Sequence, residues 1–343
     1  MDRRGFLKEL GLVGGSGMLL AMFPWLQSCS DEARREVAGE KARLAIVGTG
    51  SRGQYHIQNL LNTPEAEIVA LCDIYPPHLA EAAALCPGAK CYSDFDELLK
   101  DTNVQGLVIA VPLSSHAPLS IAGLRAGKHV FCEKPLSLSA EQSRELADLA
   151  KEKGVVNYCG FSNIMNPANQ YVAELVKSGK LGKIMRVHAT YDQDMLLDPS
   201  IPIAWRHINK LAGSGALGDL CSHLLSVSQM IMGDMSEVLG VQSIVIPERP
   251  VKAGSTEMGK VENDDLITFL VKYENGAIGD FSSSRVATGR KNYFYYEIQG
   301  TEGSVVYDLE RMCEVQVYFK ADADKDNGRD CGFRTVLLNP QHK

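Results

Sequence analysis

The first half of the chain alternates short apolar runs with amphipathic stretches. Continuous apolar runs at residues 44–47, 68–72 and 106–111 are typical of parallel strands covered on both faces, and a further strand is expected at 128–132. Helices are expected between and after them, at residues 54–61, 94–99, 117–126 and 139–153. The alternation predicts an α/β fold with a doubly wound parallel sheet over residues 41–161.

After residue 161 the pattern changes. Helical periodicity is found at residues 167–177 and 216–232, and strands are expected at residues 183–192, 238–246, 265–273, 277–285, 293–299 and 304–309. Asn275-Gly276 between two of these strands is a strong hairpin signal. We therefore expect an α+β domain with a mostly antiparallel sheet over residues 162–343, in which residues 321–343 form a polar surface loop.

The first 29 residues predict a targeting signal. Arg3 and Arg4 resemble a twin-arginine export signal, and an apolar segment at residues 10–25 follows. Residues 26–29 resemble a bacterial lipobox in which Cys29 would carry a lipid, and residues 30–40 form a charged tether. We expect an exported protein, periplasmic or held at the cell envelope through Cys29. A cytoplasmic N-terminal helix and a signal cut without lipidation are the alternatives.

Composition narrows the class of protein. The 343 residues, 45% hydrophobic and 22% charged, are typical of a soluble globular protein of two domains. A formal net charge of -7 argues against nucleic acid as a partner. The nine cysteines lack C-x-x-C spacing, which argues against a zinc site and a disulfide framework.

A candidate nucleotide site follows the first expected strand. Gly48, Gly50 and Gly53 form the pattern G-x-G-x-x-G. In such a loop the first glycine allows a tight turn, the second lets the backbone approach a pyrophosphate, and the third lets the helix pack closely on the strand. The next helix offers free N–H groups to the phosphates. Asp73 ends the second expected strand, at the position where a carboxylate binds the ribose hydroxyls in such folds. A carboxylate there repels the 2′-phosphate of NADP, and the next two residues supply no cation to offset this repulsion. NAD is therefore favoured over NADP. A glycine-rich turn of another α/β protein is the alternative.

Lys134 is a candidate catalytic residue. It lies between Glu133 and Pro135 at the end of an expected strand. Its ammonium could bind a substrate hydroxyl and assist proton transfer if burial lowers its pKa. A solvated surface lysine is the alternative.

Asp219 and His223 are a second candidate pair. Their i, i+4 spacing places them on one face of the helix expected at residues 216–232. His223 could act as a general base, and Asp219 could orient it or bind sugar hydroxyls. The alternative is a helix acid with a half-buried structural histidine. No further cluster completes a ligand set, so no metal is expected, and His129, His188 and His207 are expected to be structural.

Together these motifs are similar to the Gfo/Idh/MocA oxidoreductase family, which groups glucose–fructose oxidoreductase with inositol dehydrogenases. The resemblance rests on motifs spread from Lys41 to about Phe333. They are the glycine loop, Asp73, His116, Ala126-Gly127-Lys128-His129-Val130-Phe131-Cys132-Glu133-Lys134-Pro135-Leu136, Trp205-Arg206 and Gly218-Asp219-Leu220-Cys221-Ser222-His223.

The resemblance implies a Rossmann domain, an open-faced sheet domain, tightly held NAD(P) and a pyranose or cyclic polyol as substrate. It also implies a homo-oligomer that uses the second sheet. The matching catalytic positions are Lys134, Asp219 and His223. The matching cofactor positions are Gly48, Gly50, Ser51, Arg52, Gly53, Asp73, His116, Glu133, Lys134, Trp205 and Arg206.

Three departures from the family pattern concern the substrate and the chain end. Ser226 stands where many members carry an acid. Asn163 occupies a position that is often basic, which disfavours an anionic substrate. The sequence ends at Lys343, where relatives usually return to the first domain with terminal helices, so a truncated second domain is expected.

We expect an NAD(P)-dependent dehydrogenase of a sugar or polyol. His223 would take the hydroxyl proton and Lys134 would polarise the oxygen while hydride passes to the nicotinamide. Because the cell exterior has no pool of nucleotide, an exported enzyme would hold its cofactor tightly. The alternatives are an NAD-dependent glycosidase acting through transient oxidation, which the Glu133-Lys134-Pro135 run disfavours, and a non-catalytic sugar-binding lipoprotein.

Overall fold

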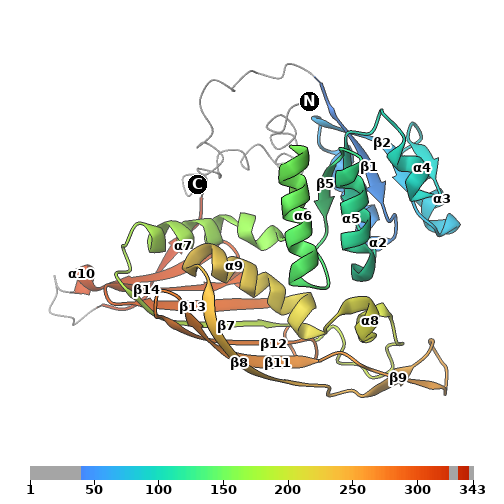
Figure 1. Cartoon of the computed structure of the whole chain (residues 1–343). Coiled ribbons are helices and arrows are strands. Elements are labelled where there is room, and N and C mark those ends of the chain that lie inside the picture. The colour runs from blue at the N-terminus through green and yellow to red at the C-terminus, as the bar shows by residue number, and fades with distance from the viewer. Residues whose placement is uncertain (1–39, 324–330, 340–343) are drawn as a thin grey trace. The chain divides into compact units, whose positions relative to one another are not determined.

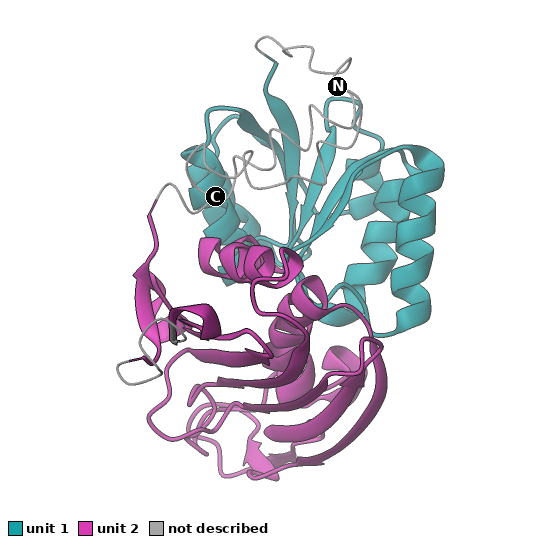
Figure 2. Cartoon of the chain, turned by 90° about the vertical axis from the view of Figure 1, so that its left-hand side faces the viewer, with its two compact units in different colours: residues 1–160 teal, residues 161–343 magenta. Residues whose placement is uncertain are grey.

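The computed structural model describes residues 40–323 and 331–339, and the chain divides into two compact units, residues 1–160 and 161–343 (Figure 2). The expected export signal, Cys29 and the tether up to Gly39 lie outside the described residues. Within the described ranges, no helix combines the length and the apolar character that crossing a membrane requires. Each unit has its own sheet and its own apolar core.

The first unit contains the predicted parallel sheet (Figure 1). Its strand order is β3-β2-β1-β4-β5-β6, and every neighbouring pair is parallel. The strands are β1 (Ala42–Val47), β2 (Ala66–Cys72), β3 (Lys90–Tyr92), β4 (Gly106–Ile109), β5 (His129–Cys132) and β6 (Asn157–Cys159). Strand order reverses next to β1, so the ligand crevice of such a sheet lies at the carboxyl ends of β1 and β4.

Helices cover both faces of this sheet. They are α2 (Ser51–Leu61), α3 (Pro76–Leu85), α4 (Phe95–Leu99), α5 (His116–Arg125) and α6 (Ala140–Lys153), with a 3₁₀ turn η4 (Leu113–Ser115). Side chains of β1 alternate between two cores: Leu44 and Ile46 pack with α2 and α3, whereas Ala45 and Val47 pack with α4, α5 and α6. This burial on both faces explains the continuous apolar runs.

The second unit contains an eight-stranded sheet in the order β16-β15-β14-β13-β7-β12-β11-β8. Among its described strands β7 and β12 pair in parallel and the other neighbours are antiparallel, as the sequence predicts for a mostly antiparallel sheet. Two short strands, β9 (Glu248–Pro250) and β10 (Met258–Lys260), form a separate ribbon. The strands of the large sheet are β7 (Ile184–Asp192), β8 (Met235–Ser243), β11 (Leu266–Tyr273), β12 (Ile278–Ser284), β13 (Tyr293–Gly300), β14 (Gly303–Asp308), β15 (Glu314–Phe319) and β16 (Arg334–Leu337).

Two long helices, α7 (Pro167–Lys177) and α9 (Ser222–Met232), pack on one face of this sheet (Figure 1). The segment expected as one α-helix at residues 216–232 begins instead with a π-helical turn, η7 (Leu217–Cys221), and α9 continues it. Such turns are often found at functional sites. The remaining short elements are η5 (Ser162–Met165), η6 (Trp205–His207), α8 (Asn209–Ala212), η8 (Leu309–Arg311) and α10 (Lys320–Ala323).

The expectation of a surface loop at residues 321–343 is wrong in part. The helix α10 extends into this segment, and β16 adds an edge strand that pairs with β15, Glu314 opposite Leu337. β16 is four residues long and mostly exposed. Of its four residues, Val336 is partly buried and packs against the core. One inward residue is too few to produce an apolar alternation in the sequence, so the pairing with β15 defines the strand.

The other face of the second sheet carries both polar pairs and exposed apolar side chains. Asp280 on β12 accepts hydrogen bonds from Arg186, at 2.9 Å, and from His188 on β7. Toward β8, Leu239 is directly opposite Leu270, and their exposed fractions are 74% and 57%. The helix-covered face is therefore the core, and the opposite face is open to solvent in the single chain.

Candidate active site

The glycine loop leaves no room for a side chain at two of its three glycines. Gly48 has φ +84°, and a Cβ there would lie 2.5 Å from the Ala110 carbonyl oxygen. A Cβ on Gly53 would lie 2.0 Å from the Gly48 oxygen. Helix α2 begins after Gly50, which has no side chain to cap the first-turn N–H groups. The loop therefore fits a pyrophosphate, which approaches the backbone closely and accepts from these groups.

Asp73 ties the glycine loop to the turn after β2. Its carboxylate accepts hydrogen bonds from the Thr49 amide at 2.7 Å and the Thr49 hydroxyl at 3.1 Å, and from the Tyr75 amide at 2.8 Å. His78 Nδ1 lies 3.9 Å from the same carboxylate. The carboxylate stands where the sequence predicts a ribose ligand. Its link to Thr49, 24 residues away, has no signal in a linear pattern.

Glu133, at the end of β5, is held by two side chains of α2. Its carboxylate lies 2.7 Å from His56 Nε2 and 3.5 Å from Arg52 Nε. Burial by itself would raise the pKa of Glu133, but the hydrogen bond to His56 and the charge of Arg52 outweigh it and lower that pKa. The sequence pattern did not lead us to predict a role for His56. Its place on the buried face of α2, with Ile57 and Leu60, was the signal that could have found it.

Lys134 is anchored through its backbone from both sides. Its amide donates to Glu133 Oε2 at 3.3 Å, and the following peptide bond, to Pro135, is cis. The buried His116 lies with Nδ1 2.7 Å from the Pro135 oxygen and Nε2 2.8 Å from the Val111 oxygen. The structure thus places His116, which was expected to bind the cofactor, where it joins the ends of β4 and β5.

In the second unit, Asp219 and His223 both border Tyr191. The His223 ring lies 5.9 Å from the Tyr191 ring and 5.8 Å from Phe161, edge to face in each case. Burial raises the pKa of Tyr191 to about 12, a hydrogen bond from Gln193 opposes this shift, and the nearby charge of Asp219 adds to it. Although Asp219 lies in the π-helical turn rather than an α-helix, the two candidate side chains therefore share one neighbourhood.

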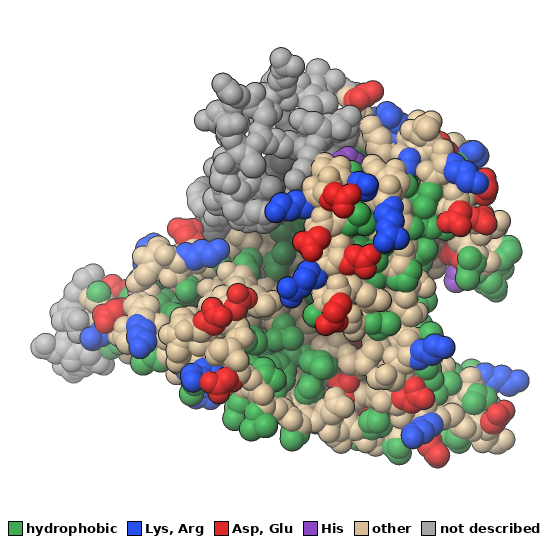
Figure 3. Space-filling view, in the orientation of Figure 1, with side chains coloured by type: hydrophobic (Ala, Val, Ile, Leu, Met, Phe, Trp, Pro, Cys, Tyr) green, Lys and Arg blue, Asp and Glu red, His purple; other side chains and the backbone are tan. Residues whose placement is uncertain are grey.

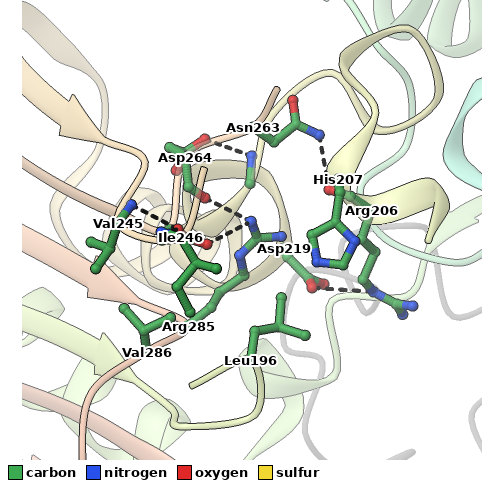
Figure 4. Close-up of polar contacts among 12 residues, drawn as sticks. Leu196, Arg206, His207, Asp219, Val245, Ile246, Asn263, Asp264, Arg285 and Val286 are labelled. Atoms are coloured by element: carbon green, nitrogen blue, oxygen red, sulfur yellow. Dashed lines mark hydrogen bonds and ion pairs between the residues drawn. The ribbon is translucent and has the colours of Figure 1, made fainter. Parts of the chain in front are cut away.

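Arg206, a predicted cofactor ligand, pairs with Asp219 in this structure. Its Nε lies 3.3 Å from Asp219 Oδ2 (Figure 4), and its guanidinium carbon lies 4.5 Å from the Trp205 ring centroid. The stacking restrains a side chain that is otherwise half exposed. Asp219 is thus held by Arg206, which lies thirteen positions earlier in the sequence. The sequence pattern does not predict this ion pair.

Polar side chains near His223 offer further hydrogen-bonding groups. The Tyr191 hydroxyl donates to Asn292 Oδ1 at 2.7 Å, and Gln193 Nε2 donates to the same oxygen at 2.8 Å. Amide and hydroxyl groups of this kind suit the recognition of neutral polyhydroxy compounds, because they both donate and accept. Sequence reasoning identified none of the three.

A buried charged cluster lies behind Asp219. Arg249, Arg285, Asp264, Asp265 and His207 are each at most 3% exposed. Figure 4 shows the Arg285 guanidinium directed toward Asp264 and Asp219. Backbone carbonyls and an Arg285–Asp265 pair at 3.5 Å offset part of these charges. Removing one partner of a buried ion pair typically costs about 3–5 kcal/mol. His207 accepts the Ala204 amide at 2.9 Å.

The surface charge is mixed. On the face drawn in Figure 3, Lys and Arg side chains are interspersed with Asp and Glu. The described residues also bring together no group of three His, Cys, Asp or Glu side chains that could hold a metal ion.

A Rossmann unit with a G-x-G-x-x-G loop and an acid after β2, followed by a unit with an open sheet, is the arrangement expected of a dinucleotide-dependent enzyme. Residues 42–161 match the oxidoreductase family with the NAD-binding Rossmann fold, and residues 169–306 match the Gfo/Idh/MocA C-terminal domain. The chain belongs to the Gfo/Idh/MocA oxidoreductase family.

Curated relatives include sugar and polyol dehydrogenases. Levoglucosan dehydrogenase of Pseudarthrobacter phenanthrenivorans is 36% identical over 291 residues, which are 81% of this chain and 73% of the relative. Myo-inositol 2-dehydrogenase of Thermotoga maritima is 28% identical over 280 residues, 80% of this chain and 77% of the relative. A solved structure of levoglucosan dehydrogenase with NADH and L-sorbose is 34% identical, covers 88% of this chain and 81% of its own, and superposes with a TM-score of 0.82.

These findings confirm the predicted family, the fold class and NAD as the cofactor. The chain is an NAD-dependent oxidoreductase of the sugar and polyol dehydrogenase family.

We predict that His207 makes the stability of the second unit depend on pH. Burial, with the charges of Arg249 and Arg285, lowers the pKa of His207 from an ordinary 6.5 to about 4. Between these values the unfolded chain binds a proton that the folded chain does not, so the free energy of unfolding falls as pH falls below 6.5. At pH 5 the loss is about 2 kcal/mol relative to pH 7.

Urea unfolding at pH 7 and pH 5 measures this loss in the parent and in His207→Asn. The variant is less stable at pH 7, because the Ala204 contact is altered, but loses less between the two pH values. Equal losses in the two proteins would show that His207 is not responsible.

Proposed function

We propose that the chain oxidises a secondary hydroxyl of a pyranose, a glycoside or a cyclic polyol. The observation that carries this proposal is the anchoring of Lys134 by Glu133 and His116 at the end of β5. Strand carboxyl ends form the ligand crevice of a doubly wound sheet, and the glycine loop opens from the same edge. An ammonium held in that crevice suits the binding and polarisation of a substrate oxygen.

The first unit would hold NAD through residues whose geometry fits it. The loop from Gly48 to Gly53, with Ser51 and Arg52, would bind the pyrophosphate, and Asp73 would bind the ribose hydroxyls. We extend the role, from the family pattern, to His116, Glu133, Trp205 and Arg206. When bound, NAD accepts the hydride. Tight retention of NAD is part of the proposal, because an exported enzyme cannot replace a lost nucleotide.

His223 would take the proton of the hydroxyl that is oxidised. Lys134 would bind the same oxygen and stabilise the charge that develops on it. Asp219 would hold the position of His223 or of a neighbouring sugar hydroxyl, while Arg206 fixes Asp219. The aromatic walls formed by Phe161 and Tyr191 would limit water at the imidazole.

The substrate class follows from two observations. The relatives are named for levoglucosan and myo-inositol, and the solved relative binds L-sorbose, all of them neutral polyhydroxy compounds. Near His223 this chain offers Tyr191, Gln193 and Asn292, which carry no charge at neutral pH. A neutral sugar or polyol therefore fits better than a sugar acid.

We predict that Lys134→Met and His223→Asn each lower kcat for saccharide oxidation by about 10²- to 10⁴-fold. His223→Asn keeps NAD affinity, because the contacts of the glycine loop and Asp73 are unchanged. Lys134→Met can weaken NAD binding, because Lys134 is also a predicted cofactor position, so its kcat is measured at saturating NAD. Lys151→Met, on the exposed side of α6, is the matched control and keeps parental kcat. Rates are read as NADH formation, with NAD affinity measured by calorimetry on the same preparations.

Two results would contradict the proposal. Either variant could keep parental turnover, or saccharides could release an aglycone without net NADH formation, which would identify the glycosidase instead.

We also propose that a second copy of the chain covers the open sheet face. The support is the row of exposed apolar side chains that includes Leu239, Leu270 and Ile278, together with the family resemblance. We predict that the protein sediments as an oligomer and that Leu239→Asp with Leu270→Asp shifts it to the monomer. A parent that sediments as a monomer at micromolar concentration would contradict this.

The proposed location is the cell envelope, reached by twin-arginine export and held by a lipid on Cys29. The support is the sequence of residues 1–29. We predict that Cys29→Ala moves the exported protein from the membrane fraction to the soluble periplasmic fraction, and that Arg3→Lys with Arg4→Lys keeps it in the cytoplasm. Parental distribution of both variants would refute the proposal.

A further inference from the structure

Two neighbouring buried acids, Asp264 and Asp265, precede β11. Their exposed fractions are 3% and 0%. Each carboxylate accepts two backbone N–H groups, but the two acids serve different segments. Asp265 Oδ2 accepts from Val245 at 2.8 Å and Ile246 at 2.9 Å, beyond the end of β8. Asp264 is directed to the segment that leads into η7.

Three consecutive N–H groups of that segment donate to Asp264. Gly215 N donates to Oδ1 at 2.5 Å, Leu217 N donates to Oδ2 at 2.9 Å, and Ala216 N donates to the backbone oxygen of Asp264 at 3.0 Å. A Cβ on Gly215 would lie 1.8 Å from the Asp264 oxygen. The approach of the two backbones is therefore as close as glycine allows.

This contact is transmitted to Asp219 through one hydrogen bond. Asp219 N donates to the Gly215 oxygen at 2.9 Å, so the residue that Asp264 holds also fixes the backbone of Asp219. His223 follows within one further turn, at the start of α9. A shift of residues 215–217 would thus displace both side chains.

Arg285 supports Asp264 from the other side. Its Nη2 donates to the Asp264 backbone oxygen at 2.8 Å and lies 3.5 Å from Asp265 Oδ1. Figure 4 shows this guanidinium between Asp264 and Asp219. Burial lowers the pKa of Arg285, and the surrounding carboxylates, Asp219 among them, oppose that shift.

We propose that Asp264 is a positioning residue for the reaction, which acts by holding residues 215–217 and through them the orientation of Asp219 and His223. The inference rests on the catalytic roles proposed above for Asp219 and His223. Asp264 touches neither substrate nor cofactor in this account. Its function is to fix a π-helical turn whose first N–H groups would otherwise be free to move.

The adjacent Asp265 supplies a matched control. Asp264→Asn and Asp265→Asn each remove one buried charge and one of two acceptor oxygens, so both lower the thermal midpoint. Misplacement of reacting groups by about 1 Å can cost about 10²-fold in rate. We therefore expect Asp264→Asn to slow hydride transfer by about 10- to 100-fold, and Asp265→Asn to keep it within about threefold of the parent.

The readout is a single turnover of NAD-loaded enzyme with excess saccharide, followed as NADH formation. The amplitude reports the fraction of folded enzyme, and the rate constant reports the chemistry of the molecules that are folded. A merely structural role of Asp264 would lower the amplitude and leave the rate constant unchanged. Asp264→Glu keeps both carboxylate oxygens but moves them by one methylene, and it is measured in the same way. We expect its rate constant to fall as well, but by less than that of Asp264→Asn.

Equal rate constants for Asp264→Asn, Asp265→Asn and the parent would overturn the inference. So would an equal slowing of both Asn variants, which would show a general effect of buried charge. His223→Asn is run alongside: if it is also unimpaired, the proposed function has failed rather than the positioning role of Asp264.

Discussion

Helix α2 starts so close to the loop after β1 that no side chain fits between them. The Cβ that Gly53 lacks would lie 2.0 Å from the Gly48 oxygen. This contact fixes the position of α2, and α2 carries Arg52 and His56 to Glu133. Glu133 in turn accepts the amide of Lys134. A single backbone approach thus links the glycine loop, which is the proposed phosphate site, to the backbone of the proposed catalytic lysine.

In the second unit, as in the first, a buried carboxylate holds the backbone next to a proposed catalytic side chain. Glu133 holds the turn that carries Lys134, and Asp264 holds the turn that carries Asp219. In both cases a buried acid accepts one or more backbone N–H groups beside a side chain with a proposed role. His56 and Arg52 border the Glu133 carboxylate, and Arg285 donates to the backbone oxygen of Asp264. A buried carboxylate that accepts backbone N–H groups restrains them in one geometry, whereas an exposed ion pair would contribute about 1 kcal/mol or less and allow movement.

The sequence predicts the four central strands of the first unit, β2, β1, β4 and β5, because most of their side chains are buried, and its glycine loop because that loop is local. The three-residue outer strands β3 and β6, which are more exposed, and the helix α3 were not predicted. Residues 48–73 lie within one strand–helix–strand unit, so their spacing predicts a dinucleotide-binding fold. The edge strand β16 was not predicted because it is short and only Val336 among its four residues packs against the core. The π-helical turn at Asp219 escaped it because a hydrophobic period does not distinguish the two helix types over five residues. The supporting residues His56, Arg285 and Asp264 were not predicted either. Each makes its contact with a residue 21 to 77 positions away in the sequence, and only the fold reveals such contacts.

We propose above that this chain oxidises a neutral sugar or polyol with NAD that it holds tightly. The most direct measurement is the absorbance spectrum of the protein, purified without its first 29 residues, before and after addition of levoglucosan, myo-inositol and simple pyranosides. The account predicts nucleotide that copurifies with the protein and a band of reduced nicotinamide that appears with at least one of these compounds. Folded protein that binds no nucleotide, or bound NAD that no saccharide reduces, would contradict it.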